Sequence, residues 1–197
     1  MKNRMSGYSS KDTEILKSDK AQNKNLLLFI EAANICLREE SFEKLSVSRI
    51  VSKAGLSRQT FYRCCSSKFD MVNRYYDRIL KTTFKEAAVH RNLHVFPLLL
   101  MERMLPKKDL FRAAFVTEDY DGLTKYAQRQ VYQAYLDYLK RKYDERIDSY
   151  YERLLELYSI SFVQIIKQWS FGDILKDVGE AVDMVRDVTP AKLEILL

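Results

Sequence analysis

The stretch at residues 46–68, SVSRIVSKAGLSRQTFYRCCSSK, constrains the fold of this chain most, because it predicts two short helices joined by a tight turn. Ser46 can cap the first helix, since a serine hydroxyl accepts a hydrogen bond from a free N–H in the first turn. Gly55 ends that helix, because glycine adopts a left-handed backbone without a Cβ clash. Ser57 caps the second helix, whose apolar Phe61 faces the core.

The second helix leaves only hydrogen-bonding side chains on its outer face. They are Arg58, Gln59, Thr60, Tyr62 and Arg63. Arginine and glutamine suit base edges, whereas hydroxyl groups and cations suit phosphate oxygens. The pattern therefore favours a helix that enters a DNA major groove. The alternative is an ordinary helix pair with a solvated polar face, because such motifs have false positives.

The region from about Leu26 to Tyr76 resembles the DNA-binding domain of the TetR/AcrR family of bacterial transcriptional regulators. The matching residues follow the family's order without insertions and are Ala32-Ala33, Phe42, Ser46-Val47, Ala54-Gly55, Ser57, Thr60-Phe61-Tyr62 and Ser67-Lys68. The resemblance implies an all-α fold. An N-terminal three-helix helix-turn-helix DNA-binding domain would precede a C-terminal helical domain for ligand sensing and dimerisation.

The sequence departs from the family pattern at two places. Ser41 stands where a glycine usually joins the first two helices. Cys64 and Cys65 replace the usual aromatic or histidine followed by phenylalanine. Cys65 can fill a core position as a small hydrophobe. Cys64 falls where the family often contacts DNA, so we expect one contact to be weakened.

The predicted DNA-binding set lies on the two short helices and at their ends. The members assigned to base edges are Arg58 and Gln59. The members assigned to phosphates are Ser46, Ser57, Thr60, Tyr62 and Lys68. The remaining members are Ser48, Arg49, Arg63 and Cys64.

The charge of the chain is segregated. Residues 1–68 carry 13 Lys and Arg against 7 Asp and Glu, whereas residues 69–197 carry 20 of each kind. The whole net charge of +6 therefore falls on the part predicted to bind DNA. Neutralisation of phosphates requires positive charge there, and a generally basic surface would not predict this division.

Composition narrows the class of protein further. With 47% hydrophobic residues, five glycines and three prolines, the chain has enough apolar mass for a core and few residues that interrupt helices. No apolar run approaches the ~20 residues that span a bilayer, and no secretory signal is recognised. Three cysteines make no disulfide framework, so we expect a cytoplasmic protein without a membrane partner.

We divide the chain into four parts. Residues 1–21 are polar and lack an apolar period, so they are predicted to form a flexible basic arm, which either follows DNA or has no role. Residues 22–68 form the helix-turn-helix domain. Residues 69–90 form a connecting helix capped by Ser67. Residues 91–197 form a helical domain for effector binding and dimerisation, as the resemblance implies.

The histidines His90 and His94 are the two in the chain and are spaced i, i+4. On one continuous helix they would lie one turn apart, where two imidazoles can bind a metal ion. No cysteine or carboxylate stands at a useful spacing beside them. We therefore expect a surface or capping pair, with no metal and no cofactor.

The C-terminal half supplies methionine and aromatic side chains that suit an apolar effector with a few polar groups. They are Met101, Met104, Phe111, Phe115, Tyr126, Tyr135, Phe162 and Trp169. Any one of them is more often plain core than ligand lining, so the sequence does not locate a cavity.

Two apolar stripes near the C-terminus suit a four-helix interface between two subunits. One lies in Ile147–Trp169 and the other in residues 174–185. A homodimer supplies the two DNA-binding domains that an operator with two half-sites requires. Half-sites one turn apart are separated by ~34–36 Å. The alternative is that the second stripe covers its own core.

The sequence favours a TetR-like transcriptional regulator, most simply a repressor that a small-molecule effector releases from a DNA operator. Alternatively, the same fold acts as a co-activator whose sensor half is held by a protein partner. Arg58–Tyr62 and Trp169 resemble the DhaS-like regulators of dihydroxyacetone use. Oxidation of Cys64 and Cys65 is a further possible trigger. An enzyme is not expected, because no phosphate loop, nucleophile elbow or general-base motif is present.

Overall fold

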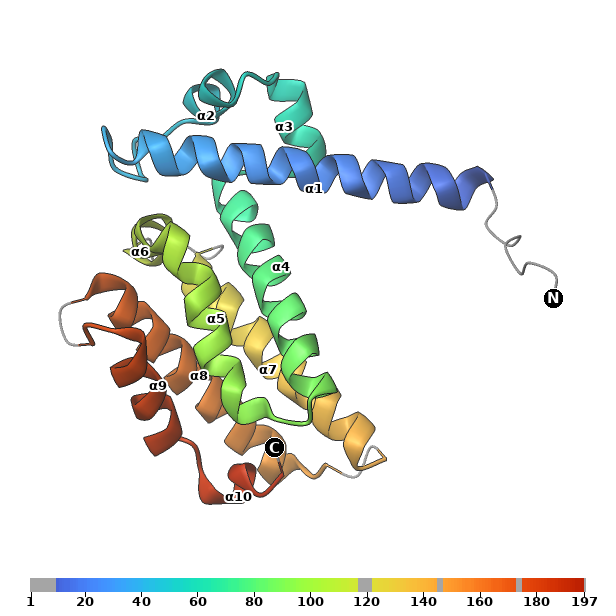
Figure 1. Ribbon diagram of the computed structural model, residues 1–197, viewed down its shortest axis with the longest axis vertical. Coiled ribbons are helices and arrows are strands. Elements are labelled where there is room, and N and C mark those ends of the chain that lie inside the picture. Colours follow the sequence, from blue (N-terminus) through green and yellow to red (C-terminus); the bar gives the residue numbers. More distant parts are fainter. Residues whose placement is uncertain (1–9, 117–121, 145–146, 173–174, 197) are drawn as a thin grey trace.

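The computed structural model describes residues 10–116, 122–144, 147–172 and 175–196, and every regular element within them is a helix. Figure 1 shows three helices lying across the top of a larger helical bundle. We call residues 10–67 the head and residues 91–196 the body. The helix α4, Lys68–Val89, runs from one into the other. The all-α architecture expected from the sequence is therefore confirmed.

The head contains α1 (Ser10–Cys36), α2 (Val47–Ala54) and α3 (Arg58–Cys64). Helix α1 packs against both short helices and against α4. Its buried face carries Leu26, Phe29, Ile30 and Ala33, which close the core of the head. The helix-turn-helix is thus fastened to one long support.

Helix α1 begins at Ser10, well before residue 22, where the helix-turn-helix domain was predicted to begin. Residues 10–21 are therefore helical and are not a flexible arm, and Figure 1 shows this part of α1 projecting past α3. The prediction relied on the missing apolar period. Extending an existing helix needs no such period, because each added residue gains a hydrogen bond without a new nucleus. The rest of the predicted arm, residues 1–9, lies outside the described residues.

The body is built from short and long helices that enclose one apolar core. They are η1 (Leu93–Val95), α5 (Phe96–Met104), η2 (Leu105–Lys107), α6 (Lys108–Val116), α7 (Leu123–Lys142), α8 (Ser149–Phe171), α9 (Val178–Asp187) and α10 (Ala191–Glu194). Helix α7 packs between α4 and α8, and α9 covers α5 and α8. Within the described ranges, no helix is both long and apolar enough to cross a membrane.

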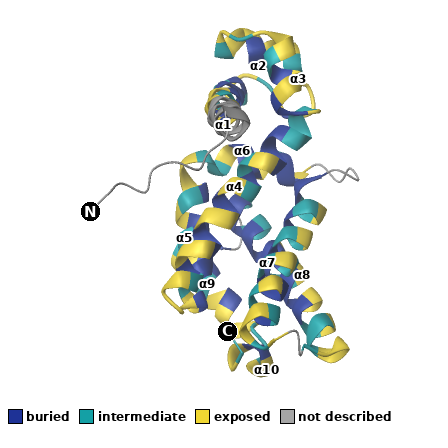
Figure 2. Ribbon diagram, turned by 90° about the vertical axis from the view of Figure 1, so that its right-hand side faces the viewer, coloured by how far each residue is buried: buried dark blue, intermediate teal, exposed yellow. Residues whose placement is uncertain are grey.

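Most side chains expected to line an effector cavity form the closed core of the body. Those with 1% exposure or less are Met101, Met104, Phe111, Phe115, Tyr135, Phe162 and Trp169. Tyr126 is partly buried at the edge of the same cluster. Figure 2 shows the buried faces of the body helices turned toward one another. In this structure these side chains are therefore part of the apolar core, as the alternative interpretation predicted.

The two C-terminal stripes also cover the core of their own subunit. Tyr158, Phe162, Ile166 and Trp169 of α8 are buried, as is Val185 of α9. Helices α6, α7 and α9 pack against α8, and α5 packs against α9, so these side chains face the interior of their own subunit. A dimer interface on these helices would use their outer faces instead.

The two histidines do not share a helix. Helix α4 ends at Val89, His90 caps it, and Arg91 takes a φ of 52°. His94 lies in η1 beyond this bend. In the described part of the chain, no group of three His, Cys, Asp or Glu residues could hold a metal ion.

The turn between α2 and α3 gives a first prediction. Gly55 has φ 66°, and an added Cβ would meet nothing within 4 Å, so a side chain there costs only backbone strain. Gly55→Ala should lower the free energy of unfolding by about 1–2 kcal/mol, measured by urea denaturation with circular dichroism. Gly55→Asn should cost clearly less, because asparagine tolerates this conformation. Equal losses in both variants would contradict the explanation.

Candidate nucleic-acid interface

The two short helices begin where their serine caps fix them. The Oγ of Ser46 accepts a hydrogen bond from the backbone N–H of Arg49 at 3.2 Å, and the Oγ of Ser57 accepts one from that of Thr60 at 3.1 Å. Between them, the backbone N–H of Gly55 donates to the carbonyl of Ser52 at 3.3 Å, and that of Leu56 donates to the carbonyl of Val51 at 3.0 Å. Both predicted caps and the predicted turn are confirmed.

Helix α3 is held by its inner face and exposes the outer one. The ring of Phe61 is fully buried and meets Phe29 of α1 edge-on, with 5.0 Å between ring centroids. Cys65 is buried beside it, as expected. The side chains left outside are Arg58, Gln59, Tyr62 and Arg63, with Thr60 partly exposed. Tyr62 is 52% exposed although its ring also packs edge-on against Phe61.

The two hydroxyl groups at the start of α3 are hydrogen-bonded to each other. The Oγ of Ser57 lies 2.9 Å from the Oγ1 of Thr60, so the two hydroxyls share a hydrogen bond. In the cap, Ser57 accepts with its lone pairs. A pair of linked hydroxyls has two protons and uses one between its members, so one proton stays free to donate.

Arg49 is exposed but already paired. Its Nη2 lies 2.6 Å from the carboxylate of Glu39, and its Nε lies 3.6 Å from that of Glu40. The hydrogen bond that Arg49 donates to Glu39, together with the charge of that carboxylate, raises the pKa of Arg49. A phosphate would have to compete with these carboxylates for the guanidinium group. Ser48, its neighbour on α2, is exposed.

Lys68 has a structural contact that the sequence did not predict. Its Nζ donates to the backbone carbonyls of Phe42, Glu43 and Leu45 at 2.7, 2.8 and 3.0 Å. It also lies 5.1 Å from the ring centroid of Phe42. Since these carbonyls take the donors of the ammonium group, the assignment of Lys68 to phosphate is wrong for this structure. Lys68 instead fastens the start of α4 to the turn before α2.

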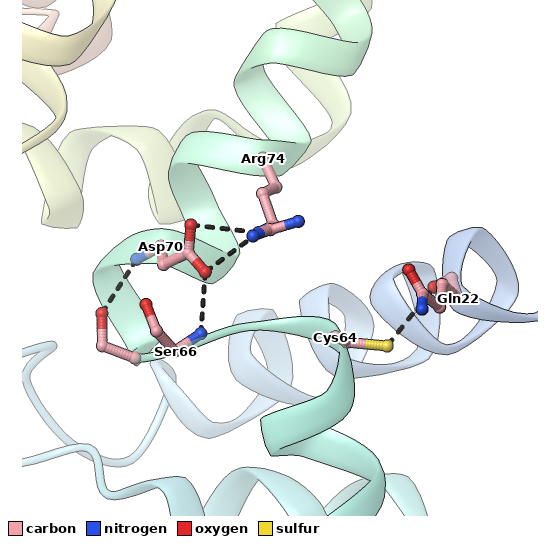
Figure 3. A network of polar contacts seen from close by, with 6 residues as sticks. Gln22, Cys64, Ser66, Asp70 and Arg74 are labelled. Atoms are coloured by element: carbon pink, nitrogen blue, oxygen red, sulfur yellow. Dashed lines mark hydrogen bonds and ion pairs between the residues drawn. The ribbon is translucent and has the colours of Figure 1, made fainter. Parts of the chain in front are cut away.

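Cys64 is the second correction, because its side chain is only 6% exposed and points at α1. Its Sγ lies 3.6 Å from the backbone carbonyl of Gln22, as Figure 3 shows. Helix α3 ends at this residue, and the side chain lies on the face that packs against α1 and not on the outer face. The interface therefore lacks the contact that the family pattern suggested.

Figure 3 also shows how the end of α3 is joined to α4. The carboxylate of Asp70 accepts from the backbone N–H of Ser66 at 2.7 Å and from the Nε of Arg74 at 2.9 Å. In return, the Oγ of Ser67 accepts from the N–H of Asp70 at 3.0 Å, which confirms the predicted cap of α4. The direction of α4 is thereby tied to that of α3.

Two exposed lysines of the head were missed by the sequence reasoning. Lys53 lies in the last turn of α2, and Lys44 lies in the turn before that helix. Both are exposed in the described head, where the neighbouring Arg49 is paired with carboxylates. Lys53 lies between the two serine caps, and Lys44 lies just before the first. Both positions could have been noted from the sequence, since cations beside a recognition helix commonly bind phosphates.

The arrangement defines the class of the protein as a helix-turn-helix DNA-binding domain carried by a helical body. Residues 29–75 match the model of the family described as "Bacterial regulatory proteins, tetR family". The match covers about a quarter of the chain, so residues 29–75 resemble the N-terminal domain of that family. A search of curated protein sequences gives no match to the chain.

Two solved structures are similar over almost the whole chain. One, described as "Dihydroxyacetone kinase operon activator DhaS", is 12% identical with a TM-score of 0.63 and covers 87% of this chain and 97% of its own. The other, a TetR transcriptional regulator from Streptococcus agalactiae 2603V, is 16% identical with a TM-score of 0.57 and covers 89% of this chain and 99% of its own. At these identities the similarity establishes the fold.

The different situations of Lys68 and Lys53 give a second prediction. Lys68→Met keeps the apolar stem but leaves carbonyl groups without their donor, so the free energy of unfolding should fall by about 2 kcal/mol. Lys53→Met should change it by less than about 0.5 kcal/mol, because Lys53 is exposed. Urea denaturation of both variants measures the difference. A stable Lys68→Met protein would show that these contacts are not needed.

The cysteines of the head give a third prediction. Burial raises the pKa of the Cys64 thiol, and burial with the nearby Asp70 carboxylate raises the pKa of Cys65 to about 12 from its ordinary 9.0. Alkylation requires the thiolate. Iodoacetamide at pH 7.5 should therefore modify the native protein at least about 100-fold more slowly than the urea-unfolded protein. The contribution of Cys65 to stability is complete below pH 9 and is lost as the pH rises toward 12.

Proposed function

We propose that the protein is a sequence-specific transcriptional regulator that binds a DNA operator through α3, acts as a cytoplasmic homodimer, and is most simply a repressor released by a small-molecule effector. One observation carries the proposal. The outer face of α3 presents Arg58, Gln59, Tyr62 and Arg63 to solvent while Phe61 fixes the helix from inside. These side chains have the chemistry that reads base edges in a major groove.

The structure refines the roles proposed for single residues. Arg58 and Gln59 stay assigned to base edges, because they stand first on the exposed helix. The phosphate set keeps its hydroxyl groups and gains two lysines. Its members are Ser46, Ser57, Thr60, Tyr62, Lys44 and Lys53. Ser48, Arg49 and Arg63 border this set, while Lys68 and Cys64 leave it.

The proposed homodimer has apolar surface available on adjacent helices. Leu157 and Ile160 of α8 are 55% and 43% exposed, and Met184 of α9 is 41% exposed. Helices α8 and α9 pack side by side. Exposed apolar side chains gathered on neighbouring helices commonly mark an interface. A two-fold axis through this surface would give two heads, as a palindromic operator requires.

Release by an effector would be a shift in population between two arrangements of the heads. Helix α4 links α3 to the body, and the body touches the head again through an ion pair between Lys107 and Glu31. The ring of Tyr75 on α4 stacks on that of Phe111 on α6, with 5.8 Å between centroids. A ligand that binds more tightly to the arrangement that does not bind DNA weakens operator affinity. The loss in free energy is set by the difference between the ligand's affinities for the two arrangements.

Two alternatives concern the trigger and the sign of regulation. One similar structure is described as an operon activator, which favours considering a co-activator whose body is held by a protein partner. Thiol oxidation at Cys64 and Cys65 is disfavoured, because both thiols are buried and their pKa values are raised.

The proposed base contacts are tested by fluorescence anisotropy on an operator selected from random DNA. Arg58→Ala should weaken specific binding by about 1–3 kcal/mol and relax the preference at one base position. Tyr62→Phe should weaken binding to all sequences alike, because it removes one phosphate contact. Lys53→Gln should lower the slope of log affinity against log salt by about 1.

Arg153→Ala is the matched control, since Arg153 is an exposed arginine of the body paired with Glu156. Its DNA affinity should equal that of the unchanged protein. The proposed interface would be rejected if Arg58→Ala bound the selected operator as tightly as this control.

A further inference from the structure

A groove of about 640 Å³ runs along the outside of the body between α4 and α7. The residues from α4 are Leu80, Lys81, Phe84, Lys85, Ala88 and Val89, and the α7 side spans residues 130–142. Figure 1 shows that the two helices run in the same direction, away from the head. The groove is therefore bounded by the helix that carries the head and by its main partner in the body.

The floor of the groove is apolar. Leu80 and Phe84 are nearly buried, and Ala134 and Tyr138 of α7 are partly exposed beside them. The rings of Phe84 and Tyr138 meet edge-on across the two helices, with 6.2 Å between centroids. An aliphatic chain lying on this floor would leave water for a mainly hydrocarbon surface.

The rim of the groove is basic. Lys81, Lys85, Arg141 and Lys142 line it, against one carboxylate, that of Asp137. The Nζ of Lys81 is paired with Asp77 at 2.8 Å, and that of Lys142 donates to the carbonyl of Leu196 at 2.8 Å.

Two of the four rim cations keep their charge available. The carboxylate of Asp137 accepts from the Nε2 of Gln133 at 2.6 Å. Lys85 and Arg141 are exposed, and no carboxylate of the described residues pairs with either. Within the described residues, the groove therefore combines an apolar floor with two cations, Lys85 and Arg141, that form no ion pair.

We propose that the α4–α7 groove binds a small amphipathic anion, a single aliphatic chain with a carboxylate or phosphate headgroup. The chain lies along Leu80, Phe84 and Ala134, and the headgroup lies between Lys85 and Arg141. The volume is within the ~300–1,000 Å³ of small-molecule sites, which favours such a ligand over a whole helix of a partner protein.

The site gives the ligand a way to act on the head. Helix α4 forms one wall, so a ligand that binds best at one separation of α4 from α7 favours the head position belonging to that separation. This consequence rests on the proposed function, because it makes the amphipathic anion the effector. The binding itself does not depend on DNA.

The test is titration calorimetry of the full chain, without DNA, with decanoate below its micelle concentration. One decanoate should bind per chain, and the dissociation constant should fall about two- to fourfold for each methylene added from octanoate to decanoate. Acetate and decyltrimethylammonium should not bind, because one lacks the chain and the other has the wrong charge. Decanoate that binds no better than decyltrimethylammonium would overturn the proposal.

Matched variants locate the site. Lys85→Gln with Arg141→Gln should weaken decanoate binding at least about tenfold. Lys125→Gln with Arg129→Gln removes the same charge from exposed positions of α7 outside the groove and should change binding by less than about twofold. Ala134→Trp, or Ala88→Trp from the opposite wall, should abolish binding by filling the groove, with folding checked by circular dichroism. Equal effects of the two charge pairs would overturn the site.

Two further measurements distinguish a free anion from a lipid headgroup and test whether the anion changes DNA binding. Sedimentation with phosphatidylglycerol vesicles should leave the protein in the supernatant, and binding to vesicles but not to free decanoate would overturn the small-molecule site. Saturating decanoate should weaken operator binding at least about fivefold. Unchanged operator affinity would overturn the role as effector. Failure of the free protein to bind any DNA would instead reject the proposed function and leave the calorimetry standing.

Discussion

Helix α3 has seven residues, and a helix of that length does not persist by itself in water. Its shape depends on burial of Phe61 against Phe29 of α1, with the cap at Ser57 and the junction at Asp70 fixing its two ends. Because the inner face is fully engaged, the outer face can consist entirely of polar side chains without loss of stability. The same packing therefore fixes the helix and leaves its polar outer face exposed.

The N-terminal and C-terminal parts of the chain differ in net charge as well as in packing. The net positive charge falls on residues 1–68, where carboxylates of the head neutralise some cations, such as Arg49, and leave others exposed. Residues 69–197 have no net charge over their sequence, yet their cations and carboxylates are not evenly paired in space. Along the α4–α7 groove the positive side chains outnumber the negative one, although the sequence total gives no sign of it.

The caps, the turn and the buried face of α3 could be predicted from the sequence, because each depends on residues within one turn of one another. The predictions failed where a distant contact decides. Lys68 was assigned to phosphate, but carbonyls more than twenty residues away bind it. Cys64 was expected outside, but α1 covers it. Likewise, periodicity marks Met101 or Phe162 as apolar, but only packing shows whether such a side chain fills a core or lines a space.

Helix α4 is 22 residues long, which at the rise of an α-helix is about 33 Å. It is a continuous rod with the body packed along its lower part and α3 attached at its upper end. A tilt of α4 by about 5° about its lower end moves its upper end by about 3 Å, roughly the rise of one base pair. A change in side-chain packing too small to alter the shape of the body can therefore displace α3 from the DNA groove that it is proposed to bind.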